Sequence, residues 1–153
     1  MQELDTKDRQ LLGLLQKNSR EQLKILAKQI GLSIDSTKKR IEKLKKNGII
    51  AKFGAFIDPK AVGYDLVANV QIKLHNISEE ELTKFISYLR AHKAVTTLIT
   101  TLGDFDITCV LIAKNTQEMD FLFREIRHKF KNIIADWKSV INLQVYKFEE
   151  YSF

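Results

Sequence analysis

Hydrophobic residues recur at helical spacing through the first 46 residues of the chain. The i, i+3, i+4, i+7 spacing predicts three short helices, at about residues 6–16, 20–30 and 34–46. Asp5 or Thr6 is suited to cap the first of them. The pattern therefore indicates a small helical unit at the start of the chain.

The junction between the second and third predicted helices is typical of a helix-turn-helix. Gly31 fits the left-handed conformation that commonly ends a helix, and Ser33 is suited to cap the helix that follows. Two helices joined by a short turn that contains glycine form this motif. Ser19 and Gln22 have the spacing of a capping box and are expected to open the second helix.

The third predicted helix has an apolar side and a cationic side. On a helical wheel the apolar side consists of Ile34, Thr37, Ile41 and Leu44. The opposite side carries Ser36, Lys39, Lys43 and Lys46, with Asp35 and Arg40 on the flanks. Because the apolar side must face the core, the cationic side is expected to be exposed.

Beyond residue 49 the pattern changes to runs that are typical of strands. Residues 50–57 predict a short strand that ends at Asp58 and Pro59, and a linker with the domain boundary near residues 58–65 follows. Further on we expect a strand at 66–74, a helix opened by a Ser78–Glu81 capping box, strands at 94–101 and 105–113 joined by a hairpin turn at 102–104, a helix capped by Asn115 or Thr116, and a strand at 139–148.

This βαββαβ order predicts a ferredoxin-like antiparallel sheet with two helices on one face. The fold class is therefore α+β, with a helix-turn-helix domain at 1–50, a strand and linker at 51–65 and a ferredoxin-like domain at 66–153. No predicted helix is left to cover the other face of the sheet. That face is expected to carry Val70, Ile72, Leu98, Val110 and Ile112, or their alternates. An uncovered apolar face favours a second copy of the chain as its partner.

The charge of the chain is concentrated in its first part. Residues 1–60 hold 14 Lys and Arg against 7 Asp and Glu, whereas residues 61–153 hold 11 against 12. Such asymmetry indicates a module for nucleic acid or another anionic surface, joined to a nearly neutral module. The single cysteine, Cys109, excludes an internal disulfide. No apolar run is long enough to span a membrane, and no signal sequence indicates export, so we expect a cytoplasmic protein.

Four segments of the chain resemble the Lrp/AsnC family of leucine-responsive or feast/famine transcription regulators. They are "LDTKDRQLLGLLQKNSR", "LAKQIGLSIDSTKKRIEKLKKNGII", "FIDPKAVGY" and "TTLGDFDI", and they occur in the family's order and spacing. The resemblance implies double-stranded DNA as a partner, homodimers formed through the sheets, and assembly of dimers into tetramers or octamers. It also implies that residues 66–153 form a dimerisation and effector-binding domain for an amino acid or a related small molecule.

Two sets of candidate site residues follow from this resemblance and from the motif. The first turns of a recognition helix lie nearest the base edges, and later residues meet phosphates. The DNA-contact candidates are Asp35, Ser36, Lys38, Lys39, Arg40, Lys43 and Lys46. The effector candidates at the hairpin are Thr100, Thr101, Leu102, Gly103, Asp104 and Asp106, although a hairpin turn alone also explains this glycine and these aspartates.

An enzyme is the main alternative to a DNA-binding regulator. Archaeal sirohaem decarboxylases are similar to the same two-domain family and act on a tetrapyrrole. The histidines His75, His92 and His128 have no metal-ligand spacing, and the chain shows no nucleophile elbow or phosphate-binding glycine loop. We therefore expect no metal, no cofactor and no catalytic residue. A ligand-binding oligomer that does not use its helix-turn-helix is a third interpretation.

Overall fold

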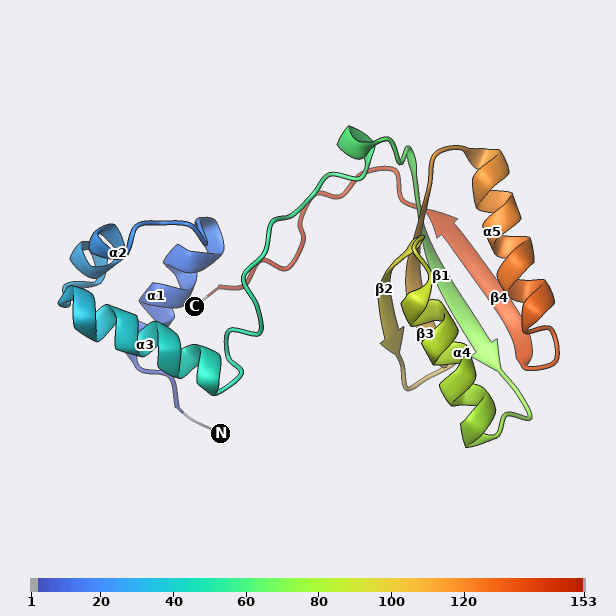
Figure 1. The fold of residues 1–153 in the computed structure, drawn as a ribbon, viewed down its shortest axis with the longest axis horizontal. Coiled ribbons are helices and arrows are strands. Elements are labelled where there is room, and N and C mark those ends of the chain that lie inside the picture. Colours follow the sequence, from blue (N-terminus) through green and yellow to red (C-terminus); the bar gives the residue numbers. More distant parts are fainter. Residues whose placement is uncertain (1–2, 153) are drawn as a thin grey trace. The chain divides into compact units, whose positions relative to one another are not determined.

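The first three helices pack into a small helical unit in the computed structural model, which describes residues 3–152 (Figure 1). The helices are α1 (Thr6–Lys17), α2 (Leu23–Ile30) and α3 (Ile34–Lys46). Their shared core is formed by Leu11, Leu12, Leu15, Leu26, Ile30 and Leu44, all of which are buried. The three predicted helices are confirmed, because the periodic apolar residues do meet in one core.

The start of α2 differs from the prediction. The helix begins at Leu23, and its N-cap Gln22 makes no side-chain cap hydrogen bond. The expected Ser19 capping box is therefore wrong. Asn18 occupies the turn instead: its side-chain oxygen accepts a hydrogen bond from the backbone N–H of Arg20 at 3.1 Å. A short polar side chain that closes such a turn competes with helix formation over these residues.

The predicted strand at 50–57 is also wrong. Residues 51–58 have no regular secondary structure, and neither do residues 142–152. A strand needs a neighbour to receive its backbone hydrogen bonds, and the described residues provide none for residues 51–58. The two extended segments do meet through side chains, since the rings of Phe56 and Phe148 lie edge to face at 5.4 Å.

The second unit, Ile57–Val145, has the expected βαββαβ order. It consists of the short 3-10 helix η1 (Lys60–Val62), β1 (Leu66–Leu74), α4 (Glu79–Ala91), β2 (Val95–Thr100), β3 (Ile107–Ala113), α5 (Thr116–Lys129) and β4 (Ile134–Ile141). The strands lie in the order β2-β3-β1-β4 and all pair antiparallel. The predicted caps are present, because Ser78 and Glu81 form a capping box and Asn115 caps α5.

The last strand begins and ends earlier than the predicted 139–148. In β4 the pairing with β1 runs from Leu74 opposite Ile134 to Ala68 opposite Ile141. The backbone N–H of Asn142 makes one more bond, to the carbonyl of Val67 at 2.8 Å. The strand ends there, two residues short of the end of β1 at Leu66, although the β-favouring run in the sequence continues.

The sheet has one face covered by α4 and α5 and one face without a covering helix (Figure 1). The prediction for the open face, which named five residues or their alternates, is right for two of the five. Val70, Ile72 and Leu98 belong to the core on the helix side. Val110 and Ile112 alternate with the buried residues of β3 and lie on the open face, together with Val67, Ile99 and Val140. Ile99 and Val140 are 50% and 63% exposed.

No helix in residues 3–152 is long and apolar enough to cross a bilayer, and α5, with 14 residues, is the longest of them.

Candidate nucleic-acid interface

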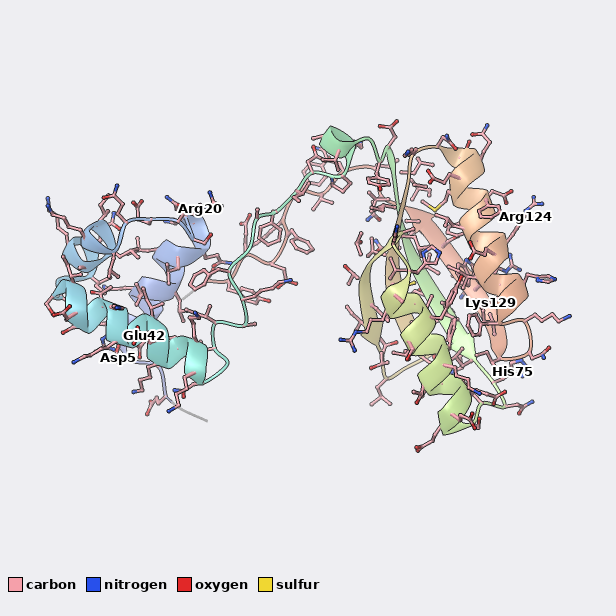
Figure 2. All side chains as sticks on the ribbon, viewed as in Figure 1. Asp5, Arg20, Glu42, His75, Arg124 and Lys129 are labelled. Atoms are coloured by element: carbon pink, nitrogen blue, oxygen red, sulfur yellow. The ribbon has the colours of Figure 1, made fainter. Side chains whose placement is uncertain are left out.

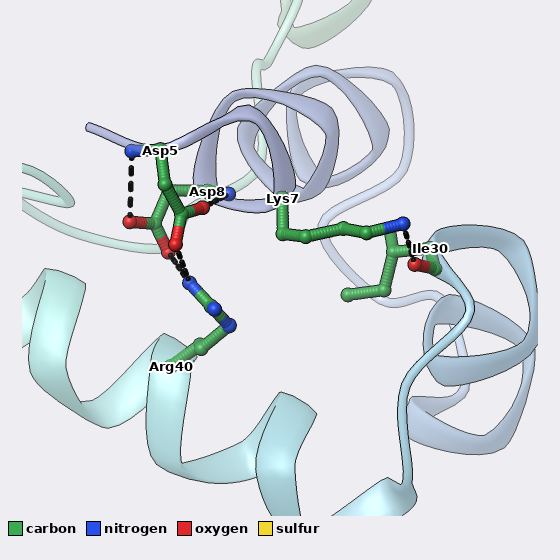
Figure 3. Close-up of polar contacts among 5 residues, drawn as sticks. All are labelled: Asp5, Lys7, Asp8, Ile30 and Arg40. Atoms are coloured by element: carbon green, nitrogen blue, oxygen red, sulfur yellow. Dashed lines mark hydrogen bonds and ion pairs between the residues drawn. The ribbon is translucent and has the colours of Figure 1, made fainter.

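The turn between α2 and α3 is fixed by backbone conformation and by hydrogen bonds. Gly31 ends α2 in the left-handed region, with φ 67° and ψ 42°. The Ser33 hydroxyl accepts the backbone N–H of Ser36 at 3.1 Å and so caps α3. Lys7 of α1 donates from Nζ to the carbonyl of Ile30 at 2.5 Å, which satisfies one of the free carbonyls at the end of α2 (Figure 3). These contacts fix the direction in which α3 leaves the turn.

One side of α3 is anchored in the core of the helical unit. Thr37 and Leu44 are 0% and 3% exposed, and Ile41 is partly buried. The hydroxyl of Thr37 donates to the carbonyl of Ser33 at 2.9 Å, so this buried polar group is satisfied. Ile34 departs from the prediction, because it is 47% exposed and lies at the edge of the anchored side.

The opposite side of α3 is exposed and strongly cationic. The lysines Lys38, Lys39, Lys43, Lys45 and Lys46 are all exposed. None of these lysines forms an ion pair with a residue of the described chain, although Lys45 lies 5.9 Å from the ring centroid of Phe53. The acidic residues of the helix are Asp35, in its first turn, and Glu42, labelled in Figure 2. Lys39, Lys43 and Lys46 lie opposite the anchored side and Lys38 and Lys45 lie on its flank, and their positive charge complements the negative charge of a DNA backbone.

Arg40 differs from the other cations of α3, because its guanidinium is turned toward α1 (Figure 3). One terminal nitrogen donates to Asp5 Oδ2 at 2.6 Å and to Asp8 Oδ1 at 2.7 Å. The Asp8 side chain is only 9% exposed and that of Arg40 30%, so this ion pair is largely shielded from solvent. Hydrogen bonds from the backbone N–H of Asp8 and from Arg40 lower the pKa of Asp5, and the two carboxylates raise the pKa of Arg40.

The hairpin between β2 and β3 brings the predicted effector residues together, but it uses some of their polar groups internally. Thr101 donates from its hydroxyl to the carbonyl of Phe105 at 2.6 Å. Asp106 accepts the backbone N–H of Leu74 on Oδ2 at 2.7 Å, and its other oxygen lies 3.6 Å from Lys73 Nζ. The remaining candidates, Thr100, Leu102, Gly103 and Asp104, are exposed. Leu102 is fully so.

Comparison with known proteins assigns both halves of the chain. Residues 4–45 match the family model of the AsnC-type helix-turn-helix domain, and residues 67–150 match that of the Lrp/AsnC ligand binding domain. The chain belongs to the Lrp/AsnC family. Like its relatives, this Lrp/AsnC chain is a helix-turn-helix transcriptional regulator that binds DNA.

Three similar proteins illustrate this membership. The HTH-type transcriptional regulator FL11 of Pyrococcus abyssi is 31% identical over 117 residues, which are 76% of each protein. An AsnC family transcriptional regulator from Agrobacterium tumefaciens has a TM-score of 0.86 at 26% identity, over 97% of this chain and 96% of that chain. A transcriptional regulator from Neisseria meningitidis, solved in complex with L-Met, has a TM-score of 0.85 over 95% and 94% of the two chains. At 20% identity this last likeness shows the fold alone.

Sequence reasoning missed two parts of this Lrp/AsnC chain. The partners of Arg40 lie 32 and 35 residues away, and nothing in the local pattern of α3 indicates them. A second basic cluster lies in α5. It was overlooked because residues 61–153 hold nearly equal numbers of acidic and basic residues. Its signal is visible in the run "REIRHKFK", residues 124–131.

Proposed function

We propose that this regulator binds double-stranded DNA as a homodimer, with α3 of each subunit in the major groove. The observation that carries the proposal is the exposed side of α3, where Lys39, Lys43 and Lys46 have no acidic partner while the opposite side is anchored in the core. A helix fixed on one side and cationic on the other can enter a groove without unfolding or repacking.

The exposed residues of α3 divide by their position along the helix. Asp35, Ser36 and Lys39 lie in or near the first turns, which in helix-turn-helix proteins approach the base edges, and Asp35 can accept from a cytosine amino group. Lys38, Lys43 and Lys46 are assigned to phosphates, where they set affinity more than sequence choice. Arg40 fits this division least well, because its guanidinium is already bonded to two carboxylates of the helical unit.

The open face of the sheet is the proposed dimer surface. Val67, Ile99, Val110, Ile112 and Val140 lie on this face without a covering helix. Pairing two such faces buries them at little structural cost, and a two-fold axis then relates two copies of α3. Replacing Val110 by Lys should convert the dimer to a monomer in analytical ultracentrifugation. A Val110→Lys protein that stays dimeric would place the dimer contact elsewhere.

An amino acid is the proposed effector, with the β2–β3 hairpin as its site. The support is the family's ligand binding domain and the L-Met complex of the Neisseria meningitidis regulator. Asp104 is exposed and available for an ammonium group, whereas Asp106 is engaged by backbone and Lys73. Calorimetry against the twenty amino acids tests this part. Absence of heat with all of them, and of any change in assembly state, would remove the proposed effector.

We also propose that the chain is not an enzyme. The sirohaem alternative is tested by mixing the protein with sirohaem, and we expect no shift of the Soret band. A saturable shift would favour the alternative.

Selection from a random duplex library tests the DNA-binding proposal. A dimer with two-fold symmetry should enrich a roughly palindromic motif whose half-sites are about 34 Å, or one helical turn, apart or a multiple of it. The variant Lys39→Ala/Lys43→Ala should enrich no motif. The charge-matched control Lys93→Ala/Lys114→Ala, which changes exposed lysines of the sheet unit, should enrich the same motif as the unaltered protein. Failure of the unaltered protein to enrich any motif would overturn the proposal.

A further inference from the structure

A shallow groove lies where the last turns of α5 meet the start of β4. Its volume is about 530 Å³, and it is lined by Arg124, Arg127, His128, Lys131, Ile134, Ala135, Asp136 and Trp137. None of these residues belongs to α3 or to the β2–β3 hairpin. The groove is therefore separate from both the proposed DNA surface and the proposed amino-acid site.

The groove is basic although the domain that contains it is nearly neutral. Residues 124–138 hold five Lys and Arg against two Asp and Glu, whereas residues 61–153 as a whole hold 11 against 12. Figure 2 labels Arg124 and Lys129 on α5, the helix whose last turns border the groove. Favourable interaction with the helix dipole explains some enrichment of cations at a helix C-terminus, but not their arrangement around a hollow with an apolar floor.

The charges in the groove differ in whether they are already neutralised. Arg124 pairs with Asp120 through contacts of 3.0 and 3.1 Å, and this pair is exposed. The Asp136 carboxylate accepts the backbone N–H of Trp137 at 2.8 Å. Arg127 and Lys131 are exposed, and among the described residues no hydrogen bond or ion pair engages them. Arg127 and Lys131 thus border the groove without a direct ionic partner among the described residues, and the Asp136 carboxylate is the acidic group in the lining.

The floor of the groove contains an unsatisfied hydrogen-bond donor. Trp137 packs against Phe123 with ring centroids 5.6 Å apart, and its indole Nε1 is buried without a hydrogen-bond partner in residues 3–152. Leaving a buried N–H unpaired costs on the order of 1–3 kcal/mol, so native structures rarely keep one without a reason. The Nε1 atom is buried, so an acceptor in the groove would satisfy it only after a shift of the Trp137 ring.

We propose that the groove binds a small organic anion that carries at least two negative charges and an apolar part. Arg127 and Lys131 bind the anionic groups, and the ring of Trp137 with the side chain of Ile134 contacts the apolar part. His128 adds a further hydrogen bond. The volume lies within the range of about 300–1,000 Å³ that is usual for small-molecule sites. Phosphates and carboxylates share this chemistry, since both accept the paired N–H groups of arginine.

A segment of duplex DNA is the other polyanion that two unpaired cations could contact. The apolar floor and the indole N–H favour a small ligand, because a DNA backbone contact uses neither of them. The same experiment distinguishes the two, and its outcome does not depend on whether α3 binds DNA.

The experiment uses the only tryptophan of the chain as its reporter. Trp137 emission is followed while the full-length protein is titrated at pH 8 with butyl phosphate or with adipate, each of which carries two negative charges and an alkyl part, at constant ionic strength and with sodium chloride alone as the blank. We expect a saturable change with at least one probe, with a Kd below about 10 mM. The stronger probe identifies the phosphate or the carboxylate class. Calorimetry with the same probes covers the case in which binding leaves the emission unchanged.

Two variants decide whether the groove itself is responsible. Arg127→Ala/Lys131→Ala should weaken binding at least tenfold, whereas Lys93→Ala/Lys114→Ala, which removes the same charge elsewhere in the unit, should leave it unchanged. Neither emission change nor heat with either probe would overturn the proposal, as would equal weakening by both variants. If the unaltered protein responds to neither probe and Arg127→Ala/Lys131→Ala binds duplex DNA more weakly, the groove contacts DNA and not a small anion.

Discussion

Replacing Arg40 by Ala separates a structural role of this residue from a DNA-binding one. The substitution removes two charged hydrogen bonds, of 2.6 Å to Asp5 and 2.7 Å to Asp8, and leaves the Asp8 carboxylate 9% exposed without a cation. The Asp5 side chain is 53% exposed, so its part of the interaction is largely screened by solvent. The capping bond from the Asp8 N–H to Asp5 at 2.8 Å stays in place, so α1 itself should still form.

The magnitude then comes mainly from the shielded contact with Asp8. Hydrogen bonds to charged groups contribute about 1.5–3 kcal/mol, so Arg40→Ala should lower the free energy of unfolding of the helical unit by about 2 kcal/mol. Urea titration followed by circular dichroism measures this decrease. The neighbouring exposed Lys39→Ala should change the same free energy by less than about 0.5 kcal/mol. In a double-mutant cycle, Arg40→Ala and Asp8→Asn should show a coupling of about 1–2 kcal/mol.

DNA binding provides the second half of this test. If Arg40 mainly holds α3 against α1, its removal weakens DNA binding without changing the slope of log Kd against log salt. If Arg40 instead binds a phosphate, its removal reduces the slope by about 0.9 for each phosphate that is no longer neutralised. A variant of unchanged stability whose slope falls like that of Lys43→Ala would refute the reasoning and return Arg40 to the DNA-contact residues.

The Arg40 interaction also has a pH dependence. The lowered pKa of Asp5 means that its contribution to stability is present above its ordinary value of 3.8 and is lost as the pH falls through the folded-state pKa. The unaltered protein should therefore become less stable on the acid side, and Arg40→Ala should reduce this effect. An identical acid dependence in both proteins would contradict the assigned cause.

Other predictions concern the turn and the buried thiol. Gly31→Ala should destabilise the helical unit by about 1–2 kcal/mol because φ is 67° there, although the added Cβ meets only Lys7 Nζ at 3.7 Å. Gly13 lies inside α1, and a Cβ added to it meets no atom within 4 Å. Gly13→Ala should therefore stabilise the helical unit by up to about 1 kcal/mol in the same urea titration. If both substitutions changed the free energy of unfolding in the same direction, the left-handed conformation of Gly31 would be contradicted. Burial raises the pKa of the Cys109 thiol to about 12, so a thiol reagent at pH 8 should modify Cys109 only when urea has unfolded the protein. Stability should also fall as the pH rises above 9.0, because the thiol then ionises in the unfolded protein and not in the folded one. Rapid modification of the folded protein would contradict this burial.

The elements predicted correctly are those specified by short-range pattern. The caps at Asp5, Ser33 and Asn115 and the left-handed Gly31 depend on residues three or four positions apart. The cationic side of α3 also follows from its own periodicity. Such features need no knowledge of distant partners, so a single sequence is enough to find them.

The errors concern features that depend on distant partners. Residues 50–57 have strand character but no neighbouring strand within the described chain. The last strand ends where its pairing with β1 stops, opposite Ala68, at a point that its own sequence does not mark. The faces of β1 were signalled by its alternation, because Val70 and Ile72 share their side with apolar residues only, whereas the other side carries Asn69, Gln71 and Lys73. Arg40 looked like its neighbouring lysines until the fold brought Asp5 and Asp8 beside it.

The salt dependence of DNA binding tests the central claim, that the exposed lysines of α3 hold DNA phosphates. A dimer that binds about 6–10 phosphates should weaken about 10³- to 10⁵-fold in affinity for its selected site between 50 and 200 mM salt. In Lys43→Ala/Lys46→Ala, which removes two of the lysines assigned to phosphates, the log–log slope should be smaller by up to about 3 to 4, because the dimer lacks four lysines, while Lys93→Ala/Lys114→Ala keeps the full slope. An affinity that does not change over this range, or equal slopes for all three proteins, would contradict the claim.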